Sequence, residues 1–267
     1  MLPGVYEARK KDGTLYFRSS ITYKNKHISL GSYDNEESAH KAYLEAGRIT
    51  SDDRIDIDSY DPENILAFKK WIVLINYRDN DMYVKTPIYL KEKFFYYYFA
   101  PEDYLIFDSD DLFYYSTHSI MRRGGHLFVA DFGMQVNILS RYGIKNFAVP
   151  GRDYQFINGN PTDFRSSNLK VINNYHGVQK KETATRVYYE TKIHVNGDIL
   201  VGRYKTETEA AVAYNKAANL LKLKGIKKSF PKNYIVDMDT DSYKTMLDTI
   251  KINDNSLKKL NIRRDMK

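Results

Sequence analysis

Residues 187–225 read VYYETKIHVNGDILVGRYKTETEAAVAYNKAANLLKLKG, and their pattern specifies a small unit of mixed α and β structure. The first half alternates apolar and polar residues with the period of a β-strand, and Asn196-Gly197-Asp198 is a strong hairpin signal before the return strand. A helix is predicted next, because Thr206 and Glu209 have capping-box spacing and Gly225 is a typical helix end. One face of that helix is formed by Ala210, Ala213, Tyr214, Ala217 and Leu221.

The same pattern occurs near the N-terminus, so the chain contains an internal repeat. Residues 3–47, PGVYEARKKDGTLYFRSSITYKNKHISLGSYDNEESAHKAYLEAG, match the region that begins HGVQKKETATRV at His176. The matched positions, in chain order, are Gly4-Val5 with Gly177-Val178, Ile21 with Ile193, Gly31-Ser32-Tyr33 with Gly202-Arg203-Tyr204, and Ala39 to Tyr43 with Ala210 to Tyr214. Each copy predicts three short antiparallel strands and one helix, and Asp34 or Asn35 caps the first helix.

Alternation along the middle strand predicts which side chains face the helix and which are exposed. The helix-facing set is Phe17, Ser19 and Ile21 in the first copy, and Tyr189, Thr191 and Ile193 in the second. The opposite register exposes Arg18, Ser20 and Thr22, and likewise Glu190, Lys192 and His194. Residues 1–33 carry six basic and two acidic side chains, whereas residues 34–50 carry four acidic and two basic ones. Because the sheet is basic and the helix behind it is acidic, we expect the sheet side of the module to face an anion.

Both copies resemble the Apetala/ethylene-response-factor type of DNA-binding domain. The resemblance is carried by Gly-Val at the first strand, an aromatic residue four positions before isoleucine in the second, Gly-x-Tyr closing the third, and Ala-x-x-Ala-Tyr in the helix. It implies a three-stranded sheet that enters the major groove and reads base edges there. Family members usually carry more arginine on these strands, so the resemblance transfers no base preference.

The resemblance places the expected DNA contacts on the two sheets. In the first copy they are Tyr6, Arg9, Lys10, Arg18, Ser20, Thr22, His27 and Ser29. In the second copy they are Gln179, Lys181, Arg186, Lys192, His194 and Arg203, with Leu200 as a further position. Glu190 and Asp198 lie among them, and they either weaken phosphate contact or accept a hydrogen bond from cytosine. The alternative for each copy is a solvated polar face on a structural unit.

A helix with the only tryptophan and a β-rich region are expected between the copies. Residues 61–79, DPENILAFKKWIVLINYRD, place Pro62 in a first helical turn and align Ile65, Phe68, Ile72 and Ile75 in one stripe. The charged stretch before it, TSDDRIDIDSYD at residues 50–61, is typical of a linker. From Met82 onward, aromatic and β-branched segments separated by acidic and Gly-Gly turns predict compact, mostly β structure.

Residues 155–172, QFINGNPTDFRSSNLKVI, resemble the motif of HNH homing endonucleases. The usual pattern there is D-H-I-N-G-N followed by L-D-N-R-x-x-N-L, in a ββα-metal fold. The residues that match are Ile157 to Asn160, Asp163, Arg165, Asn168 and Leu169. Gln155 and Phe156 replace the aspartate–histidine pair, and Phe164 replaces the central asparagine. An upstream histidine of the family is also absent, because MQVNILSRYG occupies its place.

These replacements remove the chemistry of phosphodiester hydrolysis. Histidine takes a proton from water near neutral pH and phenylalanine cannot, and the loss of a general base costs about 10²–10⁴ in rate. The divalent ion needs hard oxygen or imidazole ligands, and Gln155 is a weak one. His118 and His126 have no carboxylate neighbour at a helical ligand spacing, so we expect ordinary histidines. The sequence therefore predicts no catalytic residue, no metal site and no cofactor.

The surviving motif residues have structural uses, and basic residues surround them. Asn158-Gly159-Asn160 suits a tight turn, Asp163 can cap, and Asn168 can fasten the loop. A second hypothesis is that the retained scaffold lies on DNA. Its phosphate contacts would be Arg122, Arg123, Arg141, Arg152, Arg165 and Lys170.

Composition sets limits on the class of protein. The 267 residues exceed one typical domain of roughly 100–200. A net charge of +7 and a pI of about 9.1 favour polyanionic partners. The absence of cysteine excludes disulfides, thiolate zinc sites and cysteine nucleophiles. No run approaches the ~18–20 apolar residues of a membrane span, and the start is charged where a secretory signal is apolar. We therefore expect a cytoplasmic, nucleoid-associated protein with no membrane partner.

The sequence as a whole predicts an α+β protein in five parts. These are a DNA-binding module at 1–50, a linker and helix at 51–80, a degenerate HNH-like domain at 81–174, a second module at 175–234, and a helical, basic tail at 235–267. The predicted function is sequence-specific binding of double-stranded DNA at a bipartite site, as a transcription regulator without a small-molecule substrate. The alternatives are an active HNH endonuclease or nickase with unconventional ligands, and an inhibitor that binds an acidic protein.

Overall fold

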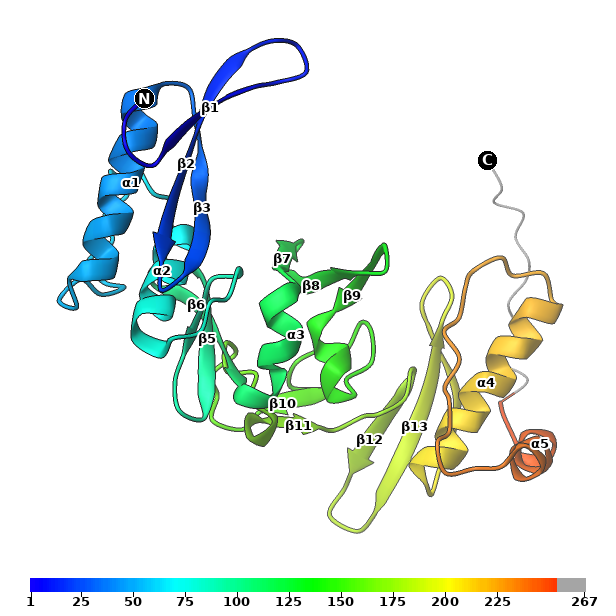
Figure 1. Ribbon diagram of the computed structural model, residues 1–267. Coiled ribbons are helices and arrows are strands. Elements are labelled where there is room, and N and C mark those ends of the chain that lie inside the picture. The colour runs from blue at the N-terminus through cyan, green and yellow to red at the C-terminus, as the bar shows by residue number, and fades with distance from the viewer. Residues whose placement is uncertain (254–267) are drawn as a thin grey trace. The chain divides into compact units, whose positions relative to one another are not determined.

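The computed structural model describes residues 1–253 and has mixed α and β structure (Figure 1). Its described strands form four three-stranded sheets and one two-stranded sheet, and every paired neighbour runs antiparallel. The expected α+β class is confirmed. None of the helices in this part of the chain combines the length and apolar character needed to cross a bilayer.

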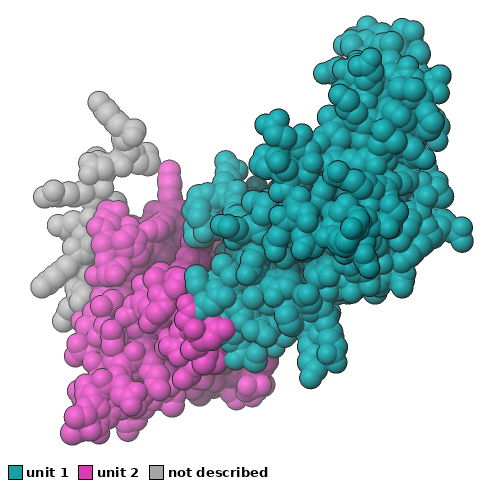
Figure 2. Space-filling view, turned by 90° about the vertical axis from the view of Figure 1, so that its left-hand side faces the viewer, with its two compact units in different colours: residues 1–137, 160–168 teal, residues 138–159, 169–267 magenta. Residues whose placement is uncertain are grey.

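The chain divides into two compact units, coloured teal and magenta in Figure 2. The first unit comprises Met1–Asn137 and Asn160–Asn168, and the second comprises Ile138–Gly159 and the chain from Leu169 onward. The HNH-like segment predicted at 81–174 is therefore shared between the units. Each unit contains one copy of the repeat.

The N-terminal module has the predicted order of three strands and one helix. Strands β1 (Val5–Arg9), β2 (Leu15–Tyr23) and β3 (Lys26–Tyr33) form one sheet, and α1 (Glu36–Ser51) covers one side of it (Figure 1). Asn35 is the N-cap, because its side chain accepts a hydrogen bond from the Ser38 amide at 2.7 Å. The core between sheet and helix contains Ile21, Ile28, Leu30, Ala42, Ala46 and Ile49.

A β-bulge alters the exposure of one strand position. The pairing of β2 with β3 shifts between Ser19 and Ser20, so Leu30 is the extra residue and lies buried in the core. Ser20 is only 7% exposed, so the expectation that it is accessible on the sheet is wrong. Ser20 lies at the bulge in the middle strand, which pairs with β1 on one side and β3 on the other, and its amide donates to Gly4 O.

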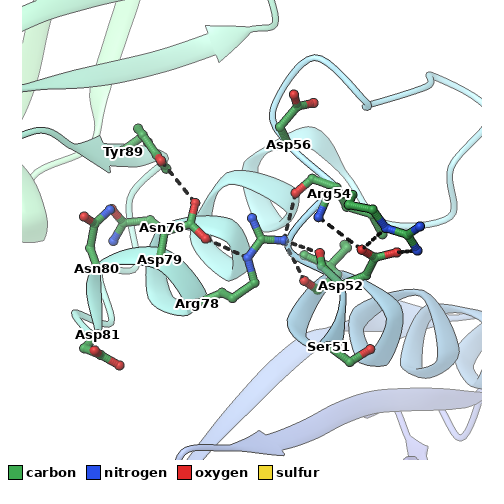
Figure 3. A network of polar contacts seen from close by, with 12 residues as sticks. Ser51, Asp52, Arg54, Asp56, Asn76, Arg78, Asp79, Asn80, Asp81 and Tyr89 are labelled. Atoms are coloured by element: carbon green, nitrogen blue, oxygen red, sulfur yellow. Dashed lines mark hydrogen bonds and ion pairs between the residues drawn. The ribbon is translucent and has the colours of Figure 1, made fainter.

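The segment expected to be a linker packs instead on the core of the first unit, and a buried arginine binds its backbone. The Arg78 side chain is 9% exposed, and its Nη1 donates to the carbonyl oxygens of Ile49, Asp52 and Ile55 at 2.7–2.9 Å (Figure 3). Its Nε bonds Asp79 at 2.6 Å. Ile49 lies in the last turn of α1 and Asp52 and Ile55 follow the helix, so Arg78 satisfies a helix-end acceptor and joins it to the segment that follows.

Arg78 belongs to α2 (Phe68–Asn80), which starts later than predicted. Pro62 and Ile65 precede this helix, so the expected first turn at Pro62 is wrong. Trp71 is buried, and its Nε1 donates to Asp56 O at 3.0 Å. Because α2 packs into the same core as α1, residues 51–80 are an integral part of the first unit.

The rest of the first unit is β-rich, as expected. Strands β4 (Ile88–Leu90), β5 (Phe94–Ala100) and β6 (Asp103–Asp108) form an aromatic sheet, and a 3-10 turn (Ser109–Asp111) leads into α3 (Leu112–Thr117). Strands β7 (Ile120–Arg123), β8 (His126–Asp131) and β9 (Met134–Asn137) form a further sheet. Phe107 stacks on Phe164 at 5.6 Å, so residues 160–168 pack on this unit.

The second unit begins with a 3-10 turn (Ile138–Tyr142) and the β10 (Tyr154–Phe156) and β11 (Leu169–Val171) pair. The C-terminal module follows as β12 (Val178–Glu182), β13 (Val187–His194), β14 (Asp198–Tyr204) and α4 (Glu207–Leu223). Both hydrogen bonds of the predicted capping box at Thr206 and Glu209 are present. Helix α5 (Thr240–Thr249) packs on α4, and the basic end of the predicted tail lies outside the described residues.

A glycine–tyrosine contact recurs in both modules and explains one repeated signal. Gly4 and Gly177 have positive φ angles of 76° and 70°. A Cβ atom at Gly4 would lie 2.1 Å from the Tyr43 ring, and one at Gly177 would lie 2.3 Å from the Tyr214 ring. The first strand therefore approaches the helix so closely that only glycine fits.

Candidate nucleic-acid interface

The C-terminal sheet has one face against α4 and one face without a helix (Figure 1). Thr191 points toward α4, because its hydroxyl donates to Ala210 O at 2.9 Å. Strand register then places the side chains that share the register of Thr191 on the α4 side and the others on the opposite side. We call the set that points away from α4 the C-terminal open face: Gln179, Lys181, Tyr188, Glu190, Lys192, His194, Asp198, Leu200 and Arg203.

Glu190 lies at the centre of the C-terminal open face and is 7% exposed. Lys192 Nζ contacts its carboxylate at 3.0 Å and Arg203 Nε at 3.1 Å. The expectation that Glu190 is exposed is therefore wrong, because two long cationic side chains flank it. Burial alone would raise the pKa of Glu190, but the hydrogen bonds from Lys192 and Arg203 outweigh it and the pKa lies below its ordinary value. Glu190 is thus a carboxylate that restrains two of the predicted DNA contacts.

The remaining predicted contacts of this module lie around that centre. Arg186 is exposed in the β12–β13 loop, with its guanidinium 5.3 Å from the Tyr188 ring centroid. His194 is exposed and bonds the equally exposed Asp198 at 2.8 Å. Gln179 and Lys181 are half-buried. All but Arg186 belong to one open face, so the sheet brings together five of the six residues predicted here.

The N-terminal open face follows from the same register: Tyr6, Ala8, Tyr16, Arg18, Ser20, Thr22, His27, Ser29 and Ser32. Arg18 is exposed, and its Nη2 donates to the Tyr16 hydroxyl at 2.6 Å. Arg9 occupies the opposite register beside Glu7, 3.5 Å away, and Lys10 lies in the β1–β2 loop. The sheet therefore groups Tyr6, Arg18, Thr22, His27 and Ser29, with Ser20 buried among them.

The HNH-like motif residues of the first unit form a closed loop. Asp163 is 1% exposed, and Arg165 binds both of its carboxylate oxygens, with Nε at 2.9 Å and Nη2 at 2.6 Å. Asn168 Nδ2 donates to Asp163 O at 2.8 Å, which confirms that it fastens the loop. Ser166 bonds Asp108 through both its amide and its hydroxyl. Asp163 and Asn168 thus stabilise the local fold.

Internal ion pairs engage several of the hypothesised phosphate contacts in this region. Arg165 pairs with Asp163, Arg122 with Asp103, and Arg152 with Asp153. Lys170 is exposed on β11, opposite Gln155. The pairing partners lower the net charge that these arginines present to a polyanion.

The HNH-like motif residues of the second unit form only a short hairpin. Phe156 pairs with Leu169 in the β10–β11 ladder, and its ring contacts Tyr154 edge-on at 5.7 Å. A ββα unit requires a helix after its second strand, but β11 ends at Val171 and β12 begins at Val178. The two strands of the expected ββα arrangement are present as β10 and β11, and the next element is the strand β12 where a helix was expected.

Asp153 is a structural residue that the sequence reasoning missed. It is 1% exposed, and its carboxylate accepts from Arg152, from Lys145 and from the Val149 amide at 2.7–3.0 Å. Burial alone would raise the pKa of Asp153, but these hydrogen bonds lower it below its ordinary value. Asn173 also contacts it and accepts from the Lys180 amide of β12. The sequence signal that could have identified Asp153 is the adjacent Arg152-Asp153 pair just before β10.

One of the two histidines near the motif has a carboxylate neighbour that the sequence did not indicate. His118 lies 3.6 Å from Asp131, a carboxylate distant in sequence, and it also stacks on Tyr114. His126 is exposed at the start of β8. Within residues 1–253, no group of three or more histidine, cysteine, aspartate or glutamate side chains is placed to hold a metal ion.

Comparisons of the chain with protein-family models, curated proteins and solved structures found no match.

Proposed function

We propose that the protein binds double-stranded DNA at a specific sequence, as a transcription regulator derived from an HNH homing endonuclease that has lost catalysis. The observation that carries the proposal is the repeated open face. In each unit, a three-stranded sheet covered by one helix presents basic, hydroxyl and imidazole groups on its other side. A two- or three-stranded surface of this kind fits a major groove about 12 Å wide.

Two modules on one chain favour a long target site. Tethering makes the second binding event intramolecular, so each module can be weak while the pair is tight. The cations on the open faces, Arg18 on one and Lys181, Lys192 and Arg203 on the other, supply phosphate contact, and the amide, hydroxyl and imidazole groups supply hydrogen bonds to base edges.

Loss of cleavage is supported by what the motif residues do instead. Phe156, at the position of the catalytic histidine, has no proton to exchange and pairs within a hairpin. Asp163 is committed to Arg165 through both carboxylate oxygens. The motif therefore contributes buried structural contacts where a nuclease needs a base and metal ligands.

Selection of duplexes from a randomised pool tests sequence-specific binding. The full chain should enrich a bipartite site, and Arg18→Ala and Lys192→Ala should each weaken binding to it. Lys41→Ala and Lys222→Ala are matched controls, because both lysines are exposed on the helices of the same modules. A pool that shows no enrichment at low salt would contradict the proposal and favour the protein-binding alternative.

Incubation of supercoiled plasmid with the purified chain tests the loss of catalysis. Magnesium or manganese should produce no nicked or linear product above that of a Phe156→Ala variant. Product that depends on both the metal ion and the intact chain would show an active nuclease.

A further inference from the structure

A cavity of about 760 Å³ lies within the second unit, beside the C-terminal open face. Lys192, His194 and Gln179 of that face line one side of it, and the loop of residues 145–153 lines another. The segment after α4, at residues 228–231, closes a third side. This cavity is separate from the HNH-like loop, and it shares Gln179, Lys192 and His194 with the contacts predicted from the sequence resemblance.

The lining of the cavity is apolar at some positions and cationic at others. Val178 and Tyr214 are buried, and Phe230 is half-buried. Four cationic side chains line it against two carboxylates. Lys145 is committed to Asp153 at 3.0 Å, whereas Lys228 is exposed and makes one long contact, 3.4 Å, to Val195 O. Apolar surface beside cationic groups suits a ligand that is both aromatic and anionic.

Phe147 adds an unusual feature to the lining. It is 81% exposed, and its φ angle is +63°, a conformation that side chains other than glycine rarely adopt. Such a conformation costs free energy and persists only where surrounding structure enforces it, which is common at binding sites. The loop therefore holds a large aromatic ring in solvent at the cavity, where it can stack on a planar group.

We infer that this cavity binds a nucleotide unit, with the base stacked on Phe147 and the phosphate held by Lys228. The nucleotide comes either from a DNA strand that contacts the adjoining open face or from the free pool. The DNA source rests on the proposed function, whereas the free source does not. Aromatic stacking explains the exposed ring, and a phosphate ion alone would leave the apolar lining unused.

Calorimetric titration with thymidine monophosphate and with thymidine tests the free source. Phe147→Ala should weaken the binding of both by about 5- to 150-fold, the range of a lost stacking contact. Lys228→Ala should weaken only the monophosphate, because thymidine has no phosphate. Phe132→Ala is the matched control: Phe132 is 96% exposed with a φ of +45° and does not line the cavity.

Photocrosslinking to a duplex that carries 5-iododeoxyuridine tests the DNA source, and anisotropy on the same duplex reports DNA binding separately. A crosslink at Phe147 that Phe132→Ala retains supports the inference. DNA binding without that crosslink, together with selective titration by the monophosphate, assigns the cavity to free nucleotide. The absence of both a crosslink at Phe147 and a Phe147-dependent titration overturns the inference, even when the DNA is bound.

Discussion

Glu190→Gln is expected to tighten DNA binding and to steepen its dependence on salt. The Glu190 carboxylate contacts Lys192 at 3.0 Å and Arg203 at 3.1 Å on the C-terminal open face. Glutamine keeps the length and shape of the side chain but removes its negative charge. Both cations then lose their ionic partner and become available to phosphate.

The magnitude follows from the number of cations released. Each phosphate neutralised adds about 0.9 to the slope of log K against log salt, so one or two released cations add about 0.9–1.8. At 0.1 M salt, each added contact corresponds to roughly 5- to 10-fold tighter binding. Lys192 and Arg203 are 38% and 57% exposed, so solvent screens the lost pairs and folding stability should fall by less than about 1 kcal/mol.

Fluorescence anisotropy of a labelled duplex, measured across about 50–300 mM salt, gives both the affinity and the slope. Asp241→Asn is the matched control, because it changes the net charge equally at an exposed position on α5. An unchanged or shallower slope would refute the restraining role of Glu190. Weaker binding confined to duplexes with one particular cytosine would show instead that Glu190 reads a base.

Three further predictions concern stability. Asp163→Ala should lower the free energy of unfolding by about 2–3 kcal/mol in urea titrations, less than for a fully buried pair because Arg165 is 36% exposed; an unchanged midpoint would contradict this. Gly177→Ala should cost more than about 2 kcal/mol, because its Cβ would meet backbone Lys192 O at 2.3 Å, while Gly151→Ala, also at positive φ but with open space, should cost about 1 kcal/mol. Burial, with a smaller effect of the Lys145 charge, lowers the pKa of His176. The unfolded chain therefore binds this proton more readily, and stability should fall as pH drops below about 6.5; His176→Gln should flatten thermal stability across that window, and an identical pH profile would count against it.

The two modules could be predicted because their signals are local. Strand alternation, the NGD turn and the capping box act within a few residues, and each was present where expected. Asn35 as N-cap and Asn168 as a loop fastener are equally local contacts. Repetition of Gly4 and Tyr43 at Gly177 and Tyr214 strengthened the prediction, because both pairs serve the same close approach.

The errors arose where contacts that the local pattern does not show decide the outcome. The stretch at 50–61 has the composition of a linker, yet Arg78, more than twenty residues away, binds its carbonyl oxygens. Glu190 has the register of an exposed residue, yet a cation from the same strand and another from the next strand cover it. Ser20 also has an exposed register, yet this short side chain is only 7% exposed in the middle strand. Alternation predicts the face of a side chain and not its accessibility.

The two open faces differ in charge at their centre, and this difference bears on the form of any target site. Arg18 lies between Tyr6 and Ser32 in the first sheet, and Glu190 lies between Gln179 and Arg203 at the equivalent place in the second. An arginine at such a place favours guanine, whose O6 and N7 both accept, whereas a carboxylate accepts from the amino group of cytosine or adenine, or neutralises its neighbours.

Modules with such different central groups are not expected to prefer the same half-site. Selection should therefore yield two unlike half-sites, and Arg18→Glu should relax the base preference of one half while leaving the other intact. A palindrome or a direct repeat in the selected duplexes would contradict this. It would mean that the central positions of the two sheets do not contact bases.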